Sequence, residues 1–136
     1  MESVTVDFGN GTSKEFLAKL DTGNSTKAST LEVGEFKEVG KYIEFNMEGK
    51  PIKLEKIGKS KAKAGEEIYE RPIVVVPQIT LGLRKLNNVP IALVKSRDNK
   101  TTNLLLNRDT MSKMGYVVHP NNAHILTKEM EKVKIV

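Results

Sequence analysis

The sequence predicts an all-β protein, a closed or partly open barrel with one short helix, formed by a single domain over residues 1–136. Three observations predict this class. Short apolar runs alternate with polar residues, turn-forming pairs such as Asn-Gly separate them, and only two short stretches have a helical pattern. Neither a linker nor a repeat divides the chain, and its length suits one modest core.

The first half of the chain is predicted to form hairpins and short strands. Residues 3–8 (SVTVDF) alternate and run into a Gly-Asn-Gly turn, and residues 15–23 (EFLAKLDTG) provide the returning strand. Two more strands are expected within residues 28–36 and 41–47, followed by a turn at 48–51.

The second half is predicted to contain a longer hairpin, further strands and the helix. The hairpin has arms at 51–57 and 68–76 and a basic tip at 58–67, and strands follow at 74–82, 89–96 and 102–107. A helix is expected over 107–115, with Asp109 or Thr110 as its N-cap and Gly115 at its C-terminal end. Residues 127–134 suit either a second helix or a strand.

Composition excludes several classes of site. Without Cys, the chain has no disulfide, thiol nucleophile or Cys-based zinc site. His119 and His124 are its two histidines and do not complete a tetrahedral metal site, and no phosphate-binding loop is present, so we expect no metal or other cofactor. No apolar run approaches the ~20 residues of a membrane span. We therefore expect a location in the cytoplasm, or in a particle assembled there.

The formal net charge is +5, and much of it comes from residues 53–65 (KLEKIGKSKAKAG). Such a run could contact nucleic acid or an acidic polypeptide. It lacks aromatic side chains for base stacking, and Glu66, Glu67 and Glu70 follow it. We therefore favour a mobile, solvated loop, and a nucleic-acid-binding barrel is the weakest of the functional alternatives.

The motif Asp21-Thr22-Gly23 ends an apolar strand. Such a motif can be a simple turn, but it is also the signature of aspartic proteases. Together with the long hairpin and an apolar strand that runs into a helix near 107–115, it resembles the retropepsin-like fold. Over about residues 15–126 the chain is similar to the bacterial retropepsin-like family called ATP-dependent zinc proteases, and the residues that match this family after the motif are Arg71-Pro72, Arg97 and Leu105-Leu106-Asn107-Arg108.

The chain departs from that family at several positions. Asn107 replaces a Gly and Asn24 replaces an Ala, while Lys100 and Asn103 replace a Met and a Pro. A Gly-to-Asn change is tolerated where φ is positive, which is the conformation expected at Asn107. The chain is therefore interpreted as a diverged member.

The resemblance implies peptide hydrolysis by two carboxylates that share one proton. Because one Asp-Thr-Gly is present, catalysis would need a homodimer or larger assembly with Asp21 from each subunit. Thr22 would hold the two loops together and Gly23 would allow a tight turn. Residues with supporting roles would be Ser25 or Thr26 as hydrogen-bond donors, and Arg97 and Arg108, paired with Asp109 or Glu70. Arg108 is equally well explained as an ordinary surface residue.

The hairpin tip would act as a flap over a peptide or protein substrate. Gly58 and Gly65 would allow it to move, and Lys59, Lys61 and Lys63 would favour an acidic peptide bound as an added strand. The alternative is a catalytically inactive member of the fold that serves as a structural or assembly protein, for example in a viral particle. In that case Asp21 is a turn residue.

Overall fold

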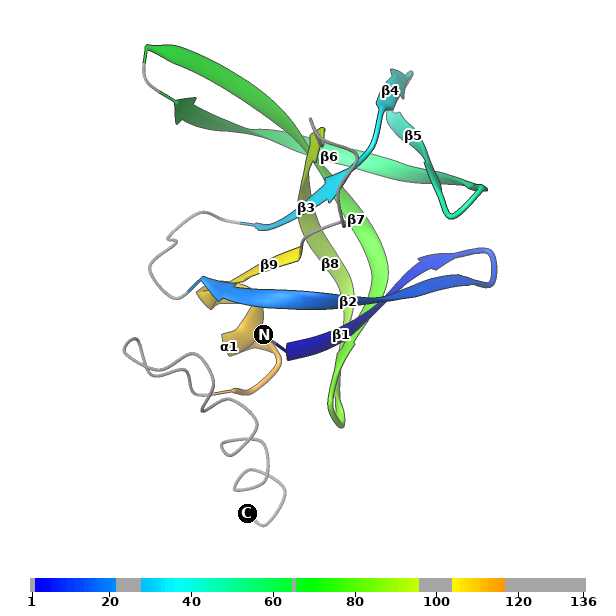
Figure 1. Ribbon diagram of the computed structural model, residues 1–136, viewed down its shortest axis with the longest axis vertical. Helices are drawn as coiled ribbons and strands as arrows, with labels where there is room; N and C mark the ends of the chain where they lie inside the picture. The colour runs from blue at the N-terminus through cyan, green and yellow to red at the C-terminus, as the bar shows by residue number, and fades with distance from the viewer. Residues whose placement is uncertain (1, 22–27, 65, 96–103, 117–136) are drawn as a thin grey trace.

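The computed structural model describes residues 2–21, 28–64, 66–95 and 104–116, which form nine strands and one helix (Figure 1). The elements are β1 (Glu2–Gly9), β2 (Thr12–Asp21), β3 (Ser29–Val33), β4 (Phe36–Val39), β5 (Tyr42–Met47), β6 (Lys50–Ala64), β7 (Glu67–Leu81), β8 (Arg84–Lys95), β9 (Leu104–Asn107) and α1 (Arg108–Lys113). The predicted all-β class with a short helix is confirmed. That helix, at six residues, is too short to cross a bilayer.

Six of these strands close into a barrel. Their order is β1-β2-β9-β3-β8-β7, and β7 pairs back with β1. The remaining strands, β6, β5 and β4, continue from β7 as a sheet outside the barrel. Two pairings in the barrel are parallel, β2 with β9 and β3 with β8, and the other four are antiparallel.

Strand β7 changes its partner along its length. Glu67–Val74 pairs with β6, and Gln78–Leu81 pairs with β1. Pro77 lies between the two segments and takes no part in the β7–β8 register, as expected for a residue without an N–H. Opposite it on β8, Asn88 has φ +54°. This irregularity lets one strand belong both to the barrel and to the outer hairpin.

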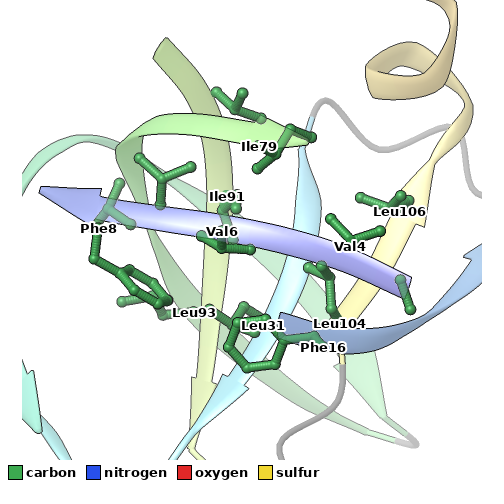
Figure 2. Packing of buried hydrophobic residues seen from close by; sticks show 14 of the residues in the cluster. Val4, Val6, Phe8, Phe16, Leu31, Ile79, Ile91, Leu93, Leu104 and Leu106 are labelled. Atoms are coloured by element: carbon green, nitrogen blue, oxygen red, sulfur yellow. The ribbon is translucent and has the colours of Figure 1, made fainter. Parts of the chain in front are cut away.

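Aliphatic and phenylalanine side chains fill the barrel (Figure 2). Along β1, Val4, Val6 and Phe8 are buried and the residues between them are partly exposed, as expected for period-two alternation. Phe8 contacts Phe16 edge to face, with ring centroids 6.2 Å apart. Leu31, Leu93, Leu104 and Leu106 reach the same core from the other strands.

The short turns follow the sequence signals. Asn10 and Gly11 have φ +53° and +73°, and Glu48 and Gly49 have φ +52° and +79°. Positive φ at both central residues matches the type I′ turn that joins tight hairpins. The predicted turns at 9–12 and 48–51 are therefore confirmed.

Two predicted loops are instead strands. Residues 58–64 belong to β6 and pair with β7, so the basic segment is not a mobile loop, and only residues 65 and 66 separate the two strands. Residues 84–88, expected within a connection, belong to β8. The possible helix at 127–134 and both histidines lie outside the described residues.

Two polar contacts join segments that are distant in the sequence. Lys56 Nζ lies 2.6 Å from Glu38 Oε1, and this hydrogen bond, more than the Lys56 charge alone, lowers the pKa of Glu38. The Tyr116 hydroxyl, buried after α1, donates to the Leu81 carbonyl. Burial raises the pKa of Tyr116, although the Arg84 charge opposes the shift.

Candidate functional site

Asp21 is the last residue of β2, and it lies beside Asn107, the last residue of β9. The two strands run parallel, with Leu20 opposite Leu106 and Asp21 opposite Asn107. Leu20 and Leu106 are buried, which fixes the register because a slip by one residue would turn both side chains out of the core. The end of the candidate catalytic strand is thus set beside the start of α1.

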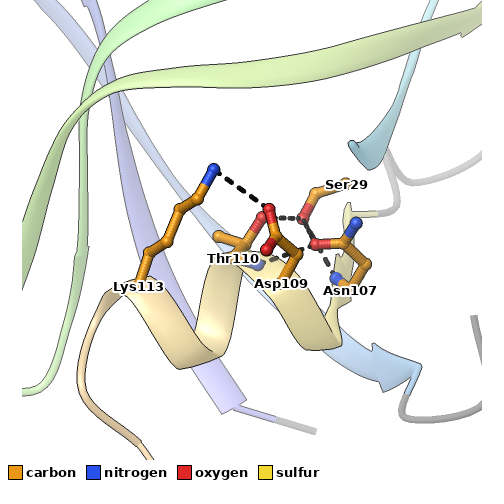
Figure 3. Close-up of polar contacts among 5 residues, drawn as sticks. All are labelled: Ser29, Asn107, Asp109, Thr110 and Lys113. Atoms are coloured by element: carbon orange, nitrogen blue, oxygen red, sulfur yellow. Dashed lines mark hydrogen bonds and ion pairs between the residues drawn. The ribbon is translucent and has the colours of Figure 1, made fainter. Parts of the chain in front are cut away.

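Asn107, Ser29 and Thr110 form a buried hydrogen-bond network at this point (Figure 3). The Asn107 backbone N–H donates to Ser29 Oγ at 3.0 Å, and the Thr110 N–H donates to Asn107 Oδ1 at 2.9 Å. Ser29 Oγ lies 3.3 Å from Asn107 Oδ1 and 2.8 Å from Thr110 Oγ1. The network joins the start of β3, the end of β9 and the first turn of α1.

One assignment of hydrogens satisfies every one of these contacts. A hydroxyl has one hydrogen to donate and two lone pairs to accept with. Ser29 can donate to Asn107 Oδ1 while it accepts from the Asn107 N–H and the Thr110 hydroxyl. Asn107 Oδ1 then accepts from both Ser29 Oγ and the Thr110 N–H. In the part of the chain that the structure describes, no buried side-chain polar atom lacks a partner.

The structure corrects two expectations for this junction. Asn107, not Asp109 or Thr110, is the N-cap of α1. Its φ and ψ are −86° and 168°, so the backbone is extended and does not need the positive φ that was expected here. A Gly at this position would therefore have no conformational advantage, and the Asn side chain caps the helix instead. Gly115 does follow the helix with φ +88°.

A row of residues crosses five strands one step before the paired ends of β2 and β9. Lys19 lies opposite Leu105, which neighbours Thr30 on β3. Thr30 neighbours Ala92 on β8, and Ala92 lies opposite Ile73 on β7. Laterally paired residues share one face of a sheet, so these five lie on the face that points away from the barrel core. Thr30 and Ala92 are nevertheless buried.

The β6–β7 hairpin extends from the barrel on the side where β2 ends (Figure 1). Its two faces differ in chemistry. Gly58, Ser60 and Arg71 share the face of Ile73, which continues from the row just described, whereas Lys59 and Lys61 share the other face with Pro72 and Glu70.

The register therefore places Lys59 and Lys61 on the hairpin face away from the row beside Asp21, whereas Arg71 lies on the face that continues from that row. Lys59 and Lys61 are exposed, and Lys59 Nζ lies 3.3 Å from Glu70 Oε2. The backbone of Lys63 pairs with Ile68 on the same ladder. Gly58 lies next to a bulge at Ile57 rather than in a loop, and Gly65 lies outside the described residues. The preference for acidic peptides that was expected from these lysines stays a prediction.

Several predicted site residues cannot be placed. Thr22, Gly23, Ser25, Thr26 and Arg97 lie outside the described residues. Arg108 is exposed in the first turn of α1. The carboxylates expected beside the arginines pair with lysines, because Asp109 lies 3.0 Å from Lys113 and Glu70 contacts Lys59. The structure therefore brings Asp21 and Asn107 together and leaves the arginine roles as predictions.

Ser29 is the residue of this site that sequence reasoning missed. In β3 it shares the buried alternation with Leu31 and Val33, so it occupies a position where an apolar residue is expected. A polar residue at a core position is a signal in itself, because burial without a partner costs about 1–3 kcal/mol. Its partners lie 78 and 81 residues further along the chain.

Within the described residues, no group of three or more His, Cys, Asp or Glu side chains could hold a metal ion. No protein-family model and no curated protein matches the chain.

Proposed function

We propose that the protein is a retropepsin-like aspartic endopeptidase that acts as a homodimer, with Asp21 of each subunit as the catalytic acid and base. The observation that carries the proposal is the position of the Asp21-Thr22-Gly23 motif. Its Asp ends a barrel strand, parallel to a second strand whose end begins a helix. The order of strand, hairpin, apolar strand and helix agrees with the fold that the motif suggests.

The need for a second subunit follows from the aspartates of the chain, which are Asp7, Asp21, Asp98 and Asp109. Asp7 accepts a hydrogen bond from the Gly9 N–H at 2.8 Å, and Asp109 pairs with Lys113 on α1. Asp98 lies outside the described residues and lacks the Thr-Gly that follows Asp21. A dyad built from equivalent residues therefore needs Asp21 from two copies related by a two-fold axis.

The chemistry then follows from two neighbouring carboxyl groups that share one proton. The ionised Asp21 takes a proton from water, and the water oxygen attacks the peptide carbonyl carbon. The protonated Asp21 of the other subunit stabilises the developing oxyanion by a hydrogen bond. Proton transfer to the leaving nitrogen then breaks the C–N bond and yields a carboxylic acid and an amine.

The substrate that suits this architecture is an extended peptide. The row formed by Lys19, Leu105, Thr30, Ala92 and Ile73 provides mostly small or apolar contacts next to the end of β2. The β6–β7 hairpin, whose face toward that row carries Gly58, Ser60 and Arg71, would cover the peptide as a neighbouring strand. Specificity would then come from side chains on this face and not from the lysines.

The proposal is tested by comparing the wild-type protein with Asp21→Asn on a peptide library between about pH 4 and 7, where a shared-proton dyad works. The expected result is cleavage by the wild type and none by the variant at equal folded concentration. Asn87→Asp, at an exposed position of β8, is the matched control for the amide–carboxyl exchange and should cleave like the wild type. Equal cleavage by the Asp21→Asn variant would exclude Asp21 as the catalytic group.

One observation favours the structural or assembly alternative. Asn107, which replaces the Gly of the related enzymes, has its side-chain oxygen committed to capping α1 and to Ser29. A strand end built for stability is what a non-catalytic member of the fold would keep. Absence of cleavage by the wild type at every pH, with the Asp21→Asn variant folded and assembled normally, would favour this alternative.

A further inference from the structure

Asn107 contacts both ends of the segment that contains the candidate catalytic motif. Asp21, where the segment begins, pairs with Asn107 across the parallel β2–β9 ladder. Ser29, where β3 begins after the segment, accepts the Asn107 N–H at 3.0 Å. Strand β2 thus ends at Asp21 and β3 begins at Ser29, and Asn107 contacts both of these residues.

The groups that make this contact are buried and hydrogen-bonded to one another. Asn107 and Ser29 have no exposed surface, and Thr110 is 3% exposed. Thr110 links the same oxygen of Ser29 to the first turn of α1 at 2.8 Å. Water therefore has little access to the network, and the low local dielectric makes each hydrogen bond stronger than it would be in water.

Helix capping explains why Asn107 is polar, but stability alone does not explain the contact between the Ser29 and Thr110 hydroxyls. Replacement of both partners of a buried hydrogen bond by apolar groups of the same shape is often neutral or stabilising. Ser29 precedes Leu31 and Val33 in the buried phase of β3, so an aliphatic side chain would suit the strand. What a satisfied polar network adds is a single defined arrangement of the elements that it joins.

Catalytic groups need such definition, because a displacement of about 1 Å can lower a rate by about a hundredfold. We propose that Ser29 and Thr110, acting through Asn107, are positioning residues that fix the strand end at Asp21. This inference rests on the proposed function, since it assigns the network to the geometry of the Asp21 dyad. Neither Ser29 nor Thr110 touches the reacting atoms in this account.

The test compares full-length variants on a peptide that the wild type cleaves, at a temperature where circular dichroism shows every variant folded. Ser29→Ala removes both contacts to Asn107, Thr110→Val removes one hydroxyl without a change of shape, and Thr110→Ser retains that hydroxyl. Thr80→Val, on β7 opposite Thr5 and Lys85, is the matched control outside the network.

The expected result is a kcat lowered about tenfold to a hundredfold in Ser29→Ala, with KM within about twofold of the wild type. Thr110→Val should lose less, and Thr110→Ser and Thr80→Val should retain the wild-type kcat. A network that only stabilises the fold would lower the melting temperature and leave kcat per folded molecule unchanged. That outcome in Ser29→Ala would overturn the proposal.

A second measurement keeps this inference separate from the proposed function. Amide hydrogen exchange is followed at Asp21 and, as a reference for the barrel core, at Val6. Exchange at Asp21 relative to Val6 should accelerate at least about tenfold in Ser29→Ala and not in Thr80→Val. If neither the wild type nor any variant cleaves peptides, the protease proposal fails. If the ratio of the exchange rates at Asp21 and Val6 is unchanged in Ser29→Ala, the positioning of Asp21 by the network is refuted separately.

Discussion

Replacement of Asn107 by Gly restores the residue that the resembled family has, and we predict that it destabilises this protein. The variant loses the acceptor for the Thr110 N–H at 2.9 Å and for the Ser29 hydroxyl at 3.3 Å. At an exposed N-cap, Asn-to-Gly costs a few tenths of a kcal/mol because water replaces the side chain. Asn107 has no exposed surface, so water is a poor replacement here.

The expected loss can be estimated from these contacts. The hydrogen bond to the Thr110 N–H contributes about 1 kcal/mol, and the donor left unpaired adds about as much. The extended backbone at φ −86° gives Gly no compensating advantage. Gly loses more conformational freedom on folding than Asn does, which costs a further ~0.5–1 kcal/mol. The sum is about 2–3 kcal/mol in the free energy of unfolding.

Urea unfolding followed by far-ultraviolet circular dichroism measures this loss at one fixed protein concentration, because self-association would otherwise shift the midpoint. Asn46→Gly, at an exposed position of β5, is the matched control and should show only the smaller backbone contribution. An Asn107→Gly variant no less stable than Asn46→Gly would refute the reasoning that the Asn107 side chain supports the junction.

Three other predictions concern the ion pairs and the buried tyrosine. Tyr116→Phe should lower the free energy of unfolding by about 1–2 kcal/mol, because the buried acceptor carbonyl loses its donor. Because the pKa of Tyr116 is raised, its ionisation should destabilise the wild type above its ordinary pKa of 10.0, and a pH series of melts should show this slope reduced in the variant. Lys56 lowers the pKa of Glu38, so the ionised Glu38 should contribute stability that is complete above its ordinary pKa of 4.5. This contribution is lost as the pH falls through the lower pKa of the folded state. Glu38→Gln should therefore make the free energy of unfolding depend less on pH in this acid range. Replacement of both Lys59 and Lys61 by Ser should leave the ratio of the cleavage rates for acidic and neutral peptides unchanged within about twofold, because these lysines lie on the hairpin face away from Ile73. A fall in this ratio would refute that placement.

The barrel could be predicted because its signals are local. Alternation in residues 3–8 and the Asn10-Gly11 turn specify the first hairpin, and the structure agrees closely. The length of β6 could not be predicted, because Lys and Ala have weak strand propensity over 59–64. Pairing with β7 overrides that preference. The sequence does not show this pairing, because only the folded chain places the residues of β7 opposite those of β6.

The candidate site was predictable in part. Asp21 at the end of a strand followed from the sequence, but its neighbour at Asn107 depends on a parallel pairing across more than 80 residues. Asn107, Asp109 and Thr110 are all suitable N-caps, and the choice between them depends on where β9 ends. The role of Ser29 depends on partners from β9 and α1, so the sequence indicates only that a polar residue occupies a buried position.

Two Asp21 carboxyl groups from different subunits are proposed to form one active centre. The most direct measurement mixes the wild-type protein with Asp21→Asn at constant total concentration, allows subunits to exchange, and records cleavage at each mixing ratio. If a mixed dimer with one Asp is inactive, the rate follows the square of the wild-type fraction, so an equal mixture retains about one quarter of the activity. A rate proportional to the wild-type fraction, with about one half retained, would contradict the shared dyad and assign any activity to the single chain.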